Sequence, residues 1–202
     1  EFRRVLFRSK PQIFPAAGAT RLRVALLTGC AQQVLAPQIN EATIRLLTRL
    51  GCEVAVAPGA GCCGSLVHHL GRTTESHRYA GANIAAWSRL WEGKGPDRIV
   101  VNASGCGTTV KDYGHMFRAD PAMADRAARI SSSARDVSEI VLELGLAGRL
   151  AAGEGERARM KIAYHSACSL QHGQKIDAAP RSLLATAGFD VVTVPEGHLC
   201  CG

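Results

Sequence analysis

The segment Val24–Gly64, VALLTGCAQQVLAPQINEATIRLLTRLGCEVAVAPGAGCCG, decides the fold of this chain. It begins with a short apolar run, Val24–Thr28, that ends just before a cysteine. A helix capped by Asn40 and stopped by Gly51 is expected next, followed by a second apolar run at Glu53–Ala57. Apolar runs that alternate with an amphipathic helix are typical of a βαβ unit with parallel strands.

The cysteines of this segment occur a second time at the same spacing. Cys30 is followed, after residues 31–61, by Cys62-Cys63-Gly64, and Cys168 is followed, after residues 169–199, by Cys200-Cys201-Gly202. The flanks are also alike, because LLTRLGCEVAVAP ends at Pro58 and LLATAGFDVVTVP ends at Pro195. We interpret this as an internal repeat of one structural unit.

The remaining pattern predicts an α/β protein with two tandem Rossmann-like βαβ repeats and parallel sheets, the second repeat truncated. The first repeat spans 10–150, a Gly-rich charged linker spans 151–160, and the second repeat spans 161–202. The expected strands after residue 57 are 98–101, 162–166 and 190–194, and the expected helices are 77–91, 122–150 and 179–187.

The first nine residues, EFRRVLFRS, fit nothing that follows, and they read as a non-native, adapter-like segment. They hold three Arg and one Glu, so excluding them lowers the net charge from +7 to +5. We expect the chain to be a fragment at both ends.

Composition narrows the class of protein. A hydrophobic content of 47% and a charged content of 20% are those of an ordinary globular chain, and no apolar run approaches the roughly 20 residues that span a bilayer. The basic residues form no cluster with interleaved aromatics, which argues against nucleic acid. Eight cysteines in a chain of this length favour metal-bound thiolates in a reducing, cytoplasmic compartment over a disulfide scaffold.

Four cysteines of the first repeat follow predicted strand ends. Cys30, Cys62, Cys63 and Cys106 each come just after one of these ends, and in an open parallel sheet such ends lie along one edge. We therefore expect the four thiols to converge and to bind an iron–sulfur cluster. The matching ligands of the second repeat are Cys168, Cys200 and Cys201.

Several other residues are assigned a structural role. Cys52 aligns with the apolar Phe189, which predicts a buried core residue rather than a ligand. His165, His172 and His198 flank the second motif, and hydrogen bonding is their default role, with a proton relay as an alternative for His172. Residues 59–64 also satisfy G-x-G-x-x-G, but the second repeat keeps the cysteines and not the glycines, so nucleotide binding is disfavoured.

Four segments carry a resemblance to known proteins: LLTGCAQQV (26–34), GCCG (61–64), NASGCGTTVKDYG (102–114) and HSACSLQHGQK (165–175). They resemble the cysteine-rich CCG domain shared by the B subunit of heterodisulfide reductase and its relatives. Within that group the chain is most similar to the glycolate oxidase iron–sulfur subunits. The family pattern has a cysteine where this chain has Ala103, which leaves four thiols at the first site, enough for a [4Fe–4S] cubane.

The resemblance implies a redox function. Such a subunit would carry an upstream ferredoxin-like module, take electrons from an FAD-containing partner that oxidises glycolate or another 2-hydroxy acid, and pass them toward quinone or another membrane acceptor. It would associate with the inner face of the membrane only through its complex, and the present chain would have no catalytic residues and no activity alone.

Two alternatives remain open at this stage. One is a thiol or disulfide redox subunit like that of heterodisulfide reductase, in which the cluster itself acts on a disulfide. The other is a zinc-binding structural module, which is disfavoured because the chain has no complete local C-x(2–4)-C knuckle.

Overall fold

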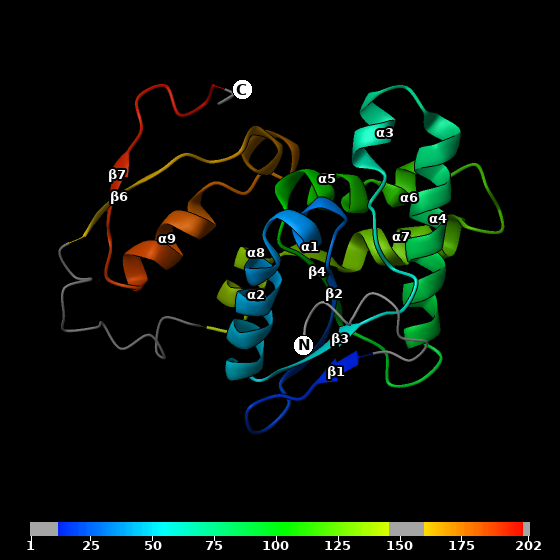
Figure 1. Ribbon diagram of the computed structural model, residues 1–202, viewed down its shortest axis with the longest axis horizontal. Coiled ribbons are helices and arrows are strands. Elements are labelled where there is room, and N and C mark those ends of the chain that lie inside the picture. The colour runs from blue at the N-terminus through cyan, green and yellow to red at the C-terminus, as the bar shows by residue number, and fades with distance from the viewer. Residues whose placement is uncertain (1–11, 146–159, 200–202) are drawn as a thin grey trace. The chain divides into compact units, whose positions relative to one another are not determined.

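The computed structural model describes residues 12–145 and 160–199 of the chain (Figure 1). It divides into two compact units, Glu1–Val137 and Ser138–Gly202, called here the first and the second unit. The segment 1–9 and, apart from Met160, the expected linker 151–160 lie outside the described residues. Their assignments therefore stay predictions.

The first unit is built on a five-stranded sheet with the order β1-β3-β2-β4-β5. Its strands are β1 (Gln12–Phe14), β2 (Leu22–Leu27), β3 (Cys52–Val56), β4 (Arg98–Val101) and β5 (Ala134–Asp136). Strands β3, β2, β4 and β5 run parallel, which confirms the expected α/β class, while β1 pairs antiparallel with β3. Strand β1 was not expected from the sequence, because three residues are too short to show a period.

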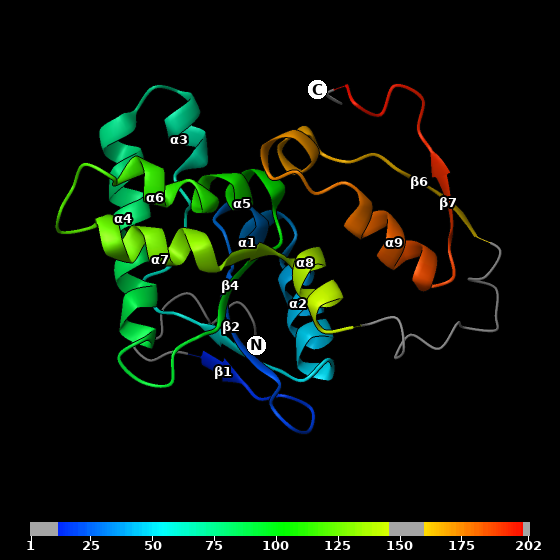
Figure 2. The ribbon, with the colours of Figure 1, turned by 180° about the vertical axis from the view of Figure 1, so that it is seen from behind.

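Helices cover both faces of this sheet. The helices of the first unit are α1 (Ala31–Leu35), α2 (Pro37–Arg49), α3 (Ser65–His69), α4 (Thr73–Leu90), α5 (Ser104–Lys111), α6 (Tyr113–Met116) and α7 (Ala124–Ser133). Helix α8 (Val137–Glu143) begins at the last residue of this unit. Helix α2 lies on one side of the sheet, and α4 and α7 lie on the other (Figures 1 and 2). None of the helices in the described ranges is both long and apolar enough to span a membrane.

The core explains why α4 and α7 occupy that face. Alternate residues of β2 and β4, such as Leu27 and Val101, are buried against Ile84 and Trp87 of α4 and Ile130 of α7. All five side chains are at most 1% exposed. Burying an apolar side chain of this size stabilises the folded state by about 1.5–3 kcal/mol. This packing therefore holds α4 against the sheet, next to the loop that carries Cys62 and Cys63.

Two expectations about helices in the first unit are wrong. Asn40 does not cap α2, because the helix begins at Pro37 and places Asn40 inside its first turns, fully buried. The predicted helix 122–150 is interrupted, because Ala134 turns to an extended conformation and the segment Ala134–Asp136 pairs with β4 as strand β5. Residues 146–150 of that prediction lie outside the described part.

The second unit repeats the start of the first. It contains β6 (Lys161–Tyr164), η4 (Ser169–Gly173, a π-helical turn), α9 (Ala178–Thr186) and β7 (Asp190–Thr193), and β6 pairs with β7 in parallel. Ile162 pairs with Val191, and the corresponding residues of the first unit, Val24 and Val54, also pair. The two copies thus share one strand register, as the internal repeat predicts.

Candidate metal centre

Four thiols of the first unit converge at the carboxyl ends of β2, β3 and β4. Cys30 directly precedes α1, Cys62 and Cys63 lie in the loop before α3, and Cys106 lies in the first turn of α5. The Sγ of Cys63 donates to the Sγ of Cys106 at 3.1 Å, and Cys30 lies close enough to Cys62 to raise the pKa of its thiol. The four thiols thus lie near one another at this edge of the sheet, and their role as cluster ligands stays a prediction.

The topology of the sheet accounts for this meeting point. The chain leaves β2 toward β3 on one side and reaches β4 on the other, so the strand order reverses between β2 and β4. Ligand sites of open α/β sheets lie in the crevice at such a switch point. The helices α1 and α3, which follow cysteines, and α5, which contains Cys106, gather along this one edge (Figure 1).

Burial and neighbouring thiols shift the pKa values of Cys62, Cys63 and Cys106. Burial, the contact with Cys30 and the charges of its neighbours raise the pKa of Cys62 from 9.0 to about 11. The hydrogen bond from Cys63 to Cys106 lowers the pKa of Cys106 and, together with burial, raises that of Cys63 far above its usual value. Four thiolates so placed repel one another, and a cationic metal cluster would offset that repulsion.

The loop that carries Cys62 and Cys63 requires a glycine at its end. Gly64 has φ +85°, in the left-handed region, and a Cβ added there would lie 2.9 Å from the carbonyl oxygen of Ser76. The Ser76 hydroxyl also donates to the Gly64 carbonyl at 3.1 Å. The third position of the CCG motif is therefore set by backbone conformation and by the close approach of α4.

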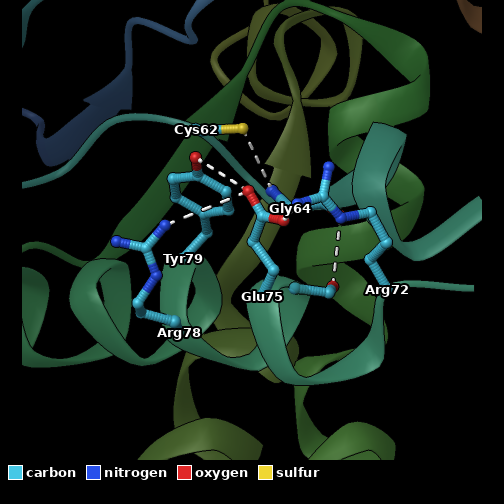
Figure 3. A network of polar contacts seen from close by, with 7 residues as sticks. Cys62, Gly64, Arg72, Glu75, Arg78 and Tyr79 are labelled. Carbon is cyan, nitrogen blue, oxygen red and sulfur yellow. Dashed lines mark hydrogen bonds and ion pairs between the residues drawn. The ribbon is translucent and has the colours of Figure 1, made fainter. Parts of the chain in front are cut away.

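Backbone N–H groups of this loop point at two of the sulfurs. The N–H of Gly64 donates to the Sγ of Cys62 at 3.4 Å (Figure 3), and the N–H of Ser65 donates to the Sγ of Cys63 at 3.5 Å. Hydrogen bonds of this kind stabilise negative charge on sulfur and favour the thiolate form that binds metal.

Two buried side chains hold the other side of the loop. Asn83 of α4 accepts from the N–H of Gly61 at 2.8 Å and donates to the carbonyl of Cys62 at 2.8 Å. The hydroxyl of Tyr113 donates to the carbonyl of Cys63 at 2.9 Å and accepts from Asn83 at 3.1 Å. Burial raises the pKa of Tyr113 far above its usual value, so its hydroxyl remains a donor.

A network of amides joins the Cys30 loop to the Cys106 loop. Asn40 donates to the carbonyl of Thr28 at 2.9 Å and accepts from Asn102 at 3.0 Å and from Gln32. Asn102 also donates to the hydroxyl of Thr43 at 2.9 Å and accepts from Gln32 at 2.9 Å. Because these residues come from the ends of β2 and β4 and from α1 and α2, the network fixes the two loops relative to each other.

A charged group lies beside the cysteine loop, at the start of α4 (Figure 3). Glu75 pairs with Arg72 at 2.6 Å and with Arg78 at 4.0 Å, and the Tyr79 hydroxyl donates to Glu75 at 3.5 Å. The Arg side chains are 63% and 70% exposed, so these pairs contribute little to stability. The Tyr79 hydroxyl thus bonds to a surface carboxylate, whereas that of Tyr113 bonds to the cysteine loop.

The remaining predicted site residues are placed as follows. Cys168 is exposed and immediately precedes η4, as Cys30 precedes α1, whereas Cys200 and Cys201 lie outside the described residues. His172 contacts the carbonyl of His198 at 3.0 Å, a hydrogen-bonding role. Cys52 is fully buried at the start of β3, the opposite end of the strand from the site, so its assignment to the core is confirmed.

Within 12–145 and 160–199, no three His, Cys, Asp or Glu side chains are arranged as ligands of a single metal ion. Among the four thiols of the first unit, Cys63 and Cys106 are hydrogen-bonded to each other, and Cys30 lies near Cys62.

Comparison with known protein families shows which family the chain belongs to. Residues 24–111 and 162–202 match the CCG family, described as a cysteine-rich domain, and the chain belongs to that family. The two matched stretches begin in β2 and in β6, the strands that precede Cys30 and Cys168.

Individual proteins of known name are also similar to this chain. The chain is 41% identical over 180 residues to the glycolate oxidase iron–sulfur subunit of Escherichia coli (strain K12), with 89% of this chain and 43% of that protein covered. It is 30% identical to the probable glycolate oxidase iron–sulfur subunit of Bacillus subtilis (strain 168), covering 96% and 43%. Lactate utilization protein A of Bacillus licheniformis is 28% identical, covering 90% and 72%. The chain thus spans less than half the length of the two glycolate oxidase subunits.

Proposed function

We propose that this chain is the CCG portion of an iron–sulfur subunit that relays electrons in a 2-hydroxy-acid oxidase complex, with glycolate as the substrate of its partner. The observation that carries the proposal is the convergence of Cys30, Cys62, Cys63 and Cys106 at the sheet's switch point. The names of the relatives, which cover glycolate and lactate, support the 2-hydroxy-acid class.

The donor set fits an iron–sulfur cluster. All four converging side chains are thiols, the ligands that such clusters take, and four is the number that a [4Fe–4S] cluster requires. In such a cluster each cysteine binds its own iron, so the ligands need not meet at one ion. Cys168, Cys200 and Cys201 would hold the centre of the second repeat.

The residues around the thiols would prepare the site for electron transfer. When bound, the cluster accepts and releases one electron at a time. Gly64 and Ser65 present N–H groups to the sulfurs, and Asn83 and Tyr113 hold the loop so that it need not rearrange as charge changes. Oxidation of the hydroxy acid itself needs a two-electron acceptor, which an FAD-containing partner would supply.

We place the subunit in the reducing cytoplasm, with electrons leaving toward quinone or another membrane acceptor and with membrane contact made through the complex. The subunit is then a non-flavin component of an oxidoreductase, and the present chain has no activity alone.

The test uses the full-length subunit, purified anaerobically, alone and with its flavoprotein. We expect bound iron and sulfide, absorbance near 400 nm, and dye reduction driven by glycolate only when the flavoprotein is present. Lactate in a parallel assay measures the choice of acid. Turnover by the subunit alone would overturn the relay assignment, and a zinc-loaded colourless protein would overturn the cluster.

A further inference from the structure

Two peptide groups of the cysteine loop are held at both ends. In the Cys63–Gly64 peptide, the carbonyl accepts from the Tyr113 hydroxyl at 2.9 Å, and the N–H donates to the Sγ of Cys62 at 3.4 Å. In the Gly64–Ser65 peptide, the carbonyl accepts from the Ser76 hydroxyl at 3.1 Å, and the N–H donates to the Sγ of Cys63 at 3.5 Å. Each sulfur is thereby linked to one buried hydroxyl through one peptide.

The geometry of a peptide makes this link rigid. In a planar trans peptide the C=O and N–H point in opposite directions, so fixing the carbonyl fixes the direction of the N–H. Gly64, shared by both peptides, lacks a Cβ and would otherwise let them rotate. Ser76 and Tyr113 are both fully buried, on α4 and α6, and water cannot replace their hydroxyls without opening the core.

Asn83 orients the Tyr113 hydroxyl. Its side-chain N–H donates to the Tyr113 oxygen at 3.1 Å, so the hydroxyl hydrogen is left to point at the Cys63 carbonyl. The phenol is therefore a fixed donor and not a rotating one.

We propose that Tyr113 and Ser76 are positioning residues that set the reduction potential of the first-unit centre, by holding two N–H groups on the sulfurs of Cys62 and Cys63. This inference rests on the proposed function. Hydrogen bonds to cluster sulfurs stabilise the more reduced, more negative state and so raise the potential. Losing either hydroxyl frees one peptide plane and weakens one N–H···S bond.

The test compares Tyr113→Phe and Ser76→Ala in the full-length subunit by redox titration followed by electron paramagnetic resonance. The signal of the first-unit centre is the one that disappears in Cys62→Ala. We expect each variant to keep its iron and to lower the potential of that signal alone, with a threefold to tenfold weaker electron affinity. A tenfold change equals 59 mV for one electron.

Tyr79→Phe is the matched control, because Tyr79 lies on the same helix as Ser76 but donates to Glu75. It should leave the potential unchanged. Unchanged potentials in both Tyr113→Phe and Ser76→Ala would overturn the proposal, and so would loss of iron in both, since the hydroxyls would then only support folding. The two substitutions act on separate peptides, so either one decides if the other fails to fold. Wild-type protein without iron would overturn the proposed function instead, before any variant is made.

Discussion

At Gly64 the backbone conformation requires a glycine. Its φ of +85° lies in the left-handed region, and a Cβ added there would lie only 2.9 Å from the carbonyl oxygen of Ser76. We expect Gly64→Ala to lower the free energy of unfolding by about 1–3 kcal/mol and to reduce bound iron, because the loop must move away from α4. Urea unfolding and iron analysis measure the two effects.

Gly61 provides the control in the same loop. A Cβ added there meets nothing within 4 Å, and its N–H, bonded to Asn83, is kept on substitution by Ala. Gly61→Ala should therefore retain both stability and iron. Equal losses at the two glycines would contradict the assignment of the strain to Gly64.

The raised pKa of Cys62 predicts that metal-free protein loses stability as the pH rises. The folded thiol keeps its proton up to a pKa of about 11, whereas the unfolded chain loses it near 9.0. Between these values the native state binds more protons than the unfolded state, so the free energy of unfolding falls with rising pH. Urea titrations of the metal-free full-length subunit at pH 8 and pH 10 check the sign, and Cys62→Ala should show a shallower decline.

At the scale of single residues, the spacing of the cysteines identified the thiols that lie together but not the residues that hold their loops. Cys30, Cys62, Cys63 and Cys106 could be found because strand ends of a parallel sheet share an edge. Ser76, Asn83 and Tyr113 could not, because they bond to backbone atoms 12 to 50 positions away. Such contacts leave no local pattern, and a buried Tyr or Asn reads as an ordinary core or helix residue.

At the scale of elements, the amide network links α2 to the loops after β2 and β4, and we expect stability to depend strongly on it. Asn40→Ala removes the donor to the Thr28 carbonyl and the acceptor of Asn102 and Gln32. Each buried polar group left unpaired costs about 1–3 kcal/mol, so we expect a large drop in the midpoint of urea unfolding. Gln38→Ala, on the same helix but outside the network, should leave the midpoint nearly unchanged. A similar drop in both variants would show that helix propensity, and not the network, is responsible.

Strand β4 was predictable from its buried apolar run, and α9 and β7 were predictable from the internal repeat. Strand β4 has the bounds expected from RIVV, and α9 and β7 are each displaced by no more than one residue at an end. Strand β5 was hidden because its three residues, Ala-Arg-Asp, have no strand preference of their own and form a strand only by pairing with β4. The conformation of this segment is therefore determined by its pairing with β4 and not by its own residues.

At the scale of the whole molecule, the repeat predicts two separable centres. In the full-length subunit, Cys168→Ala should remove about half of the iron bound by the two CCG repeats and leave the signal lost in Cys62→Ala intact, because each unit supplies its own cysteines. Iron analysis with spectroscopy makes the comparison. Cys52→Ala, in the core of the first unit, should lose none. Simultaneous loss of both signals in Cys168→Ala would indicate one shared centre.

The shared register of the two units has a consequence for their ancestry. Fifteen residues separate Cys30 from Leu46 and fourteen separate Cys168 from Leu183, while three separate Pro58 from Cys62 and four separate Pro195 from Cys200. Yet Val24 pairs with Val54 as Ile162 pairs with Val191. If one gene segment was duplicated, a deletion ahead of the second strand was balanced by an insertion behind it. The turns then served as adjustable spacers, and the strands stayed in phase while the copies diverged.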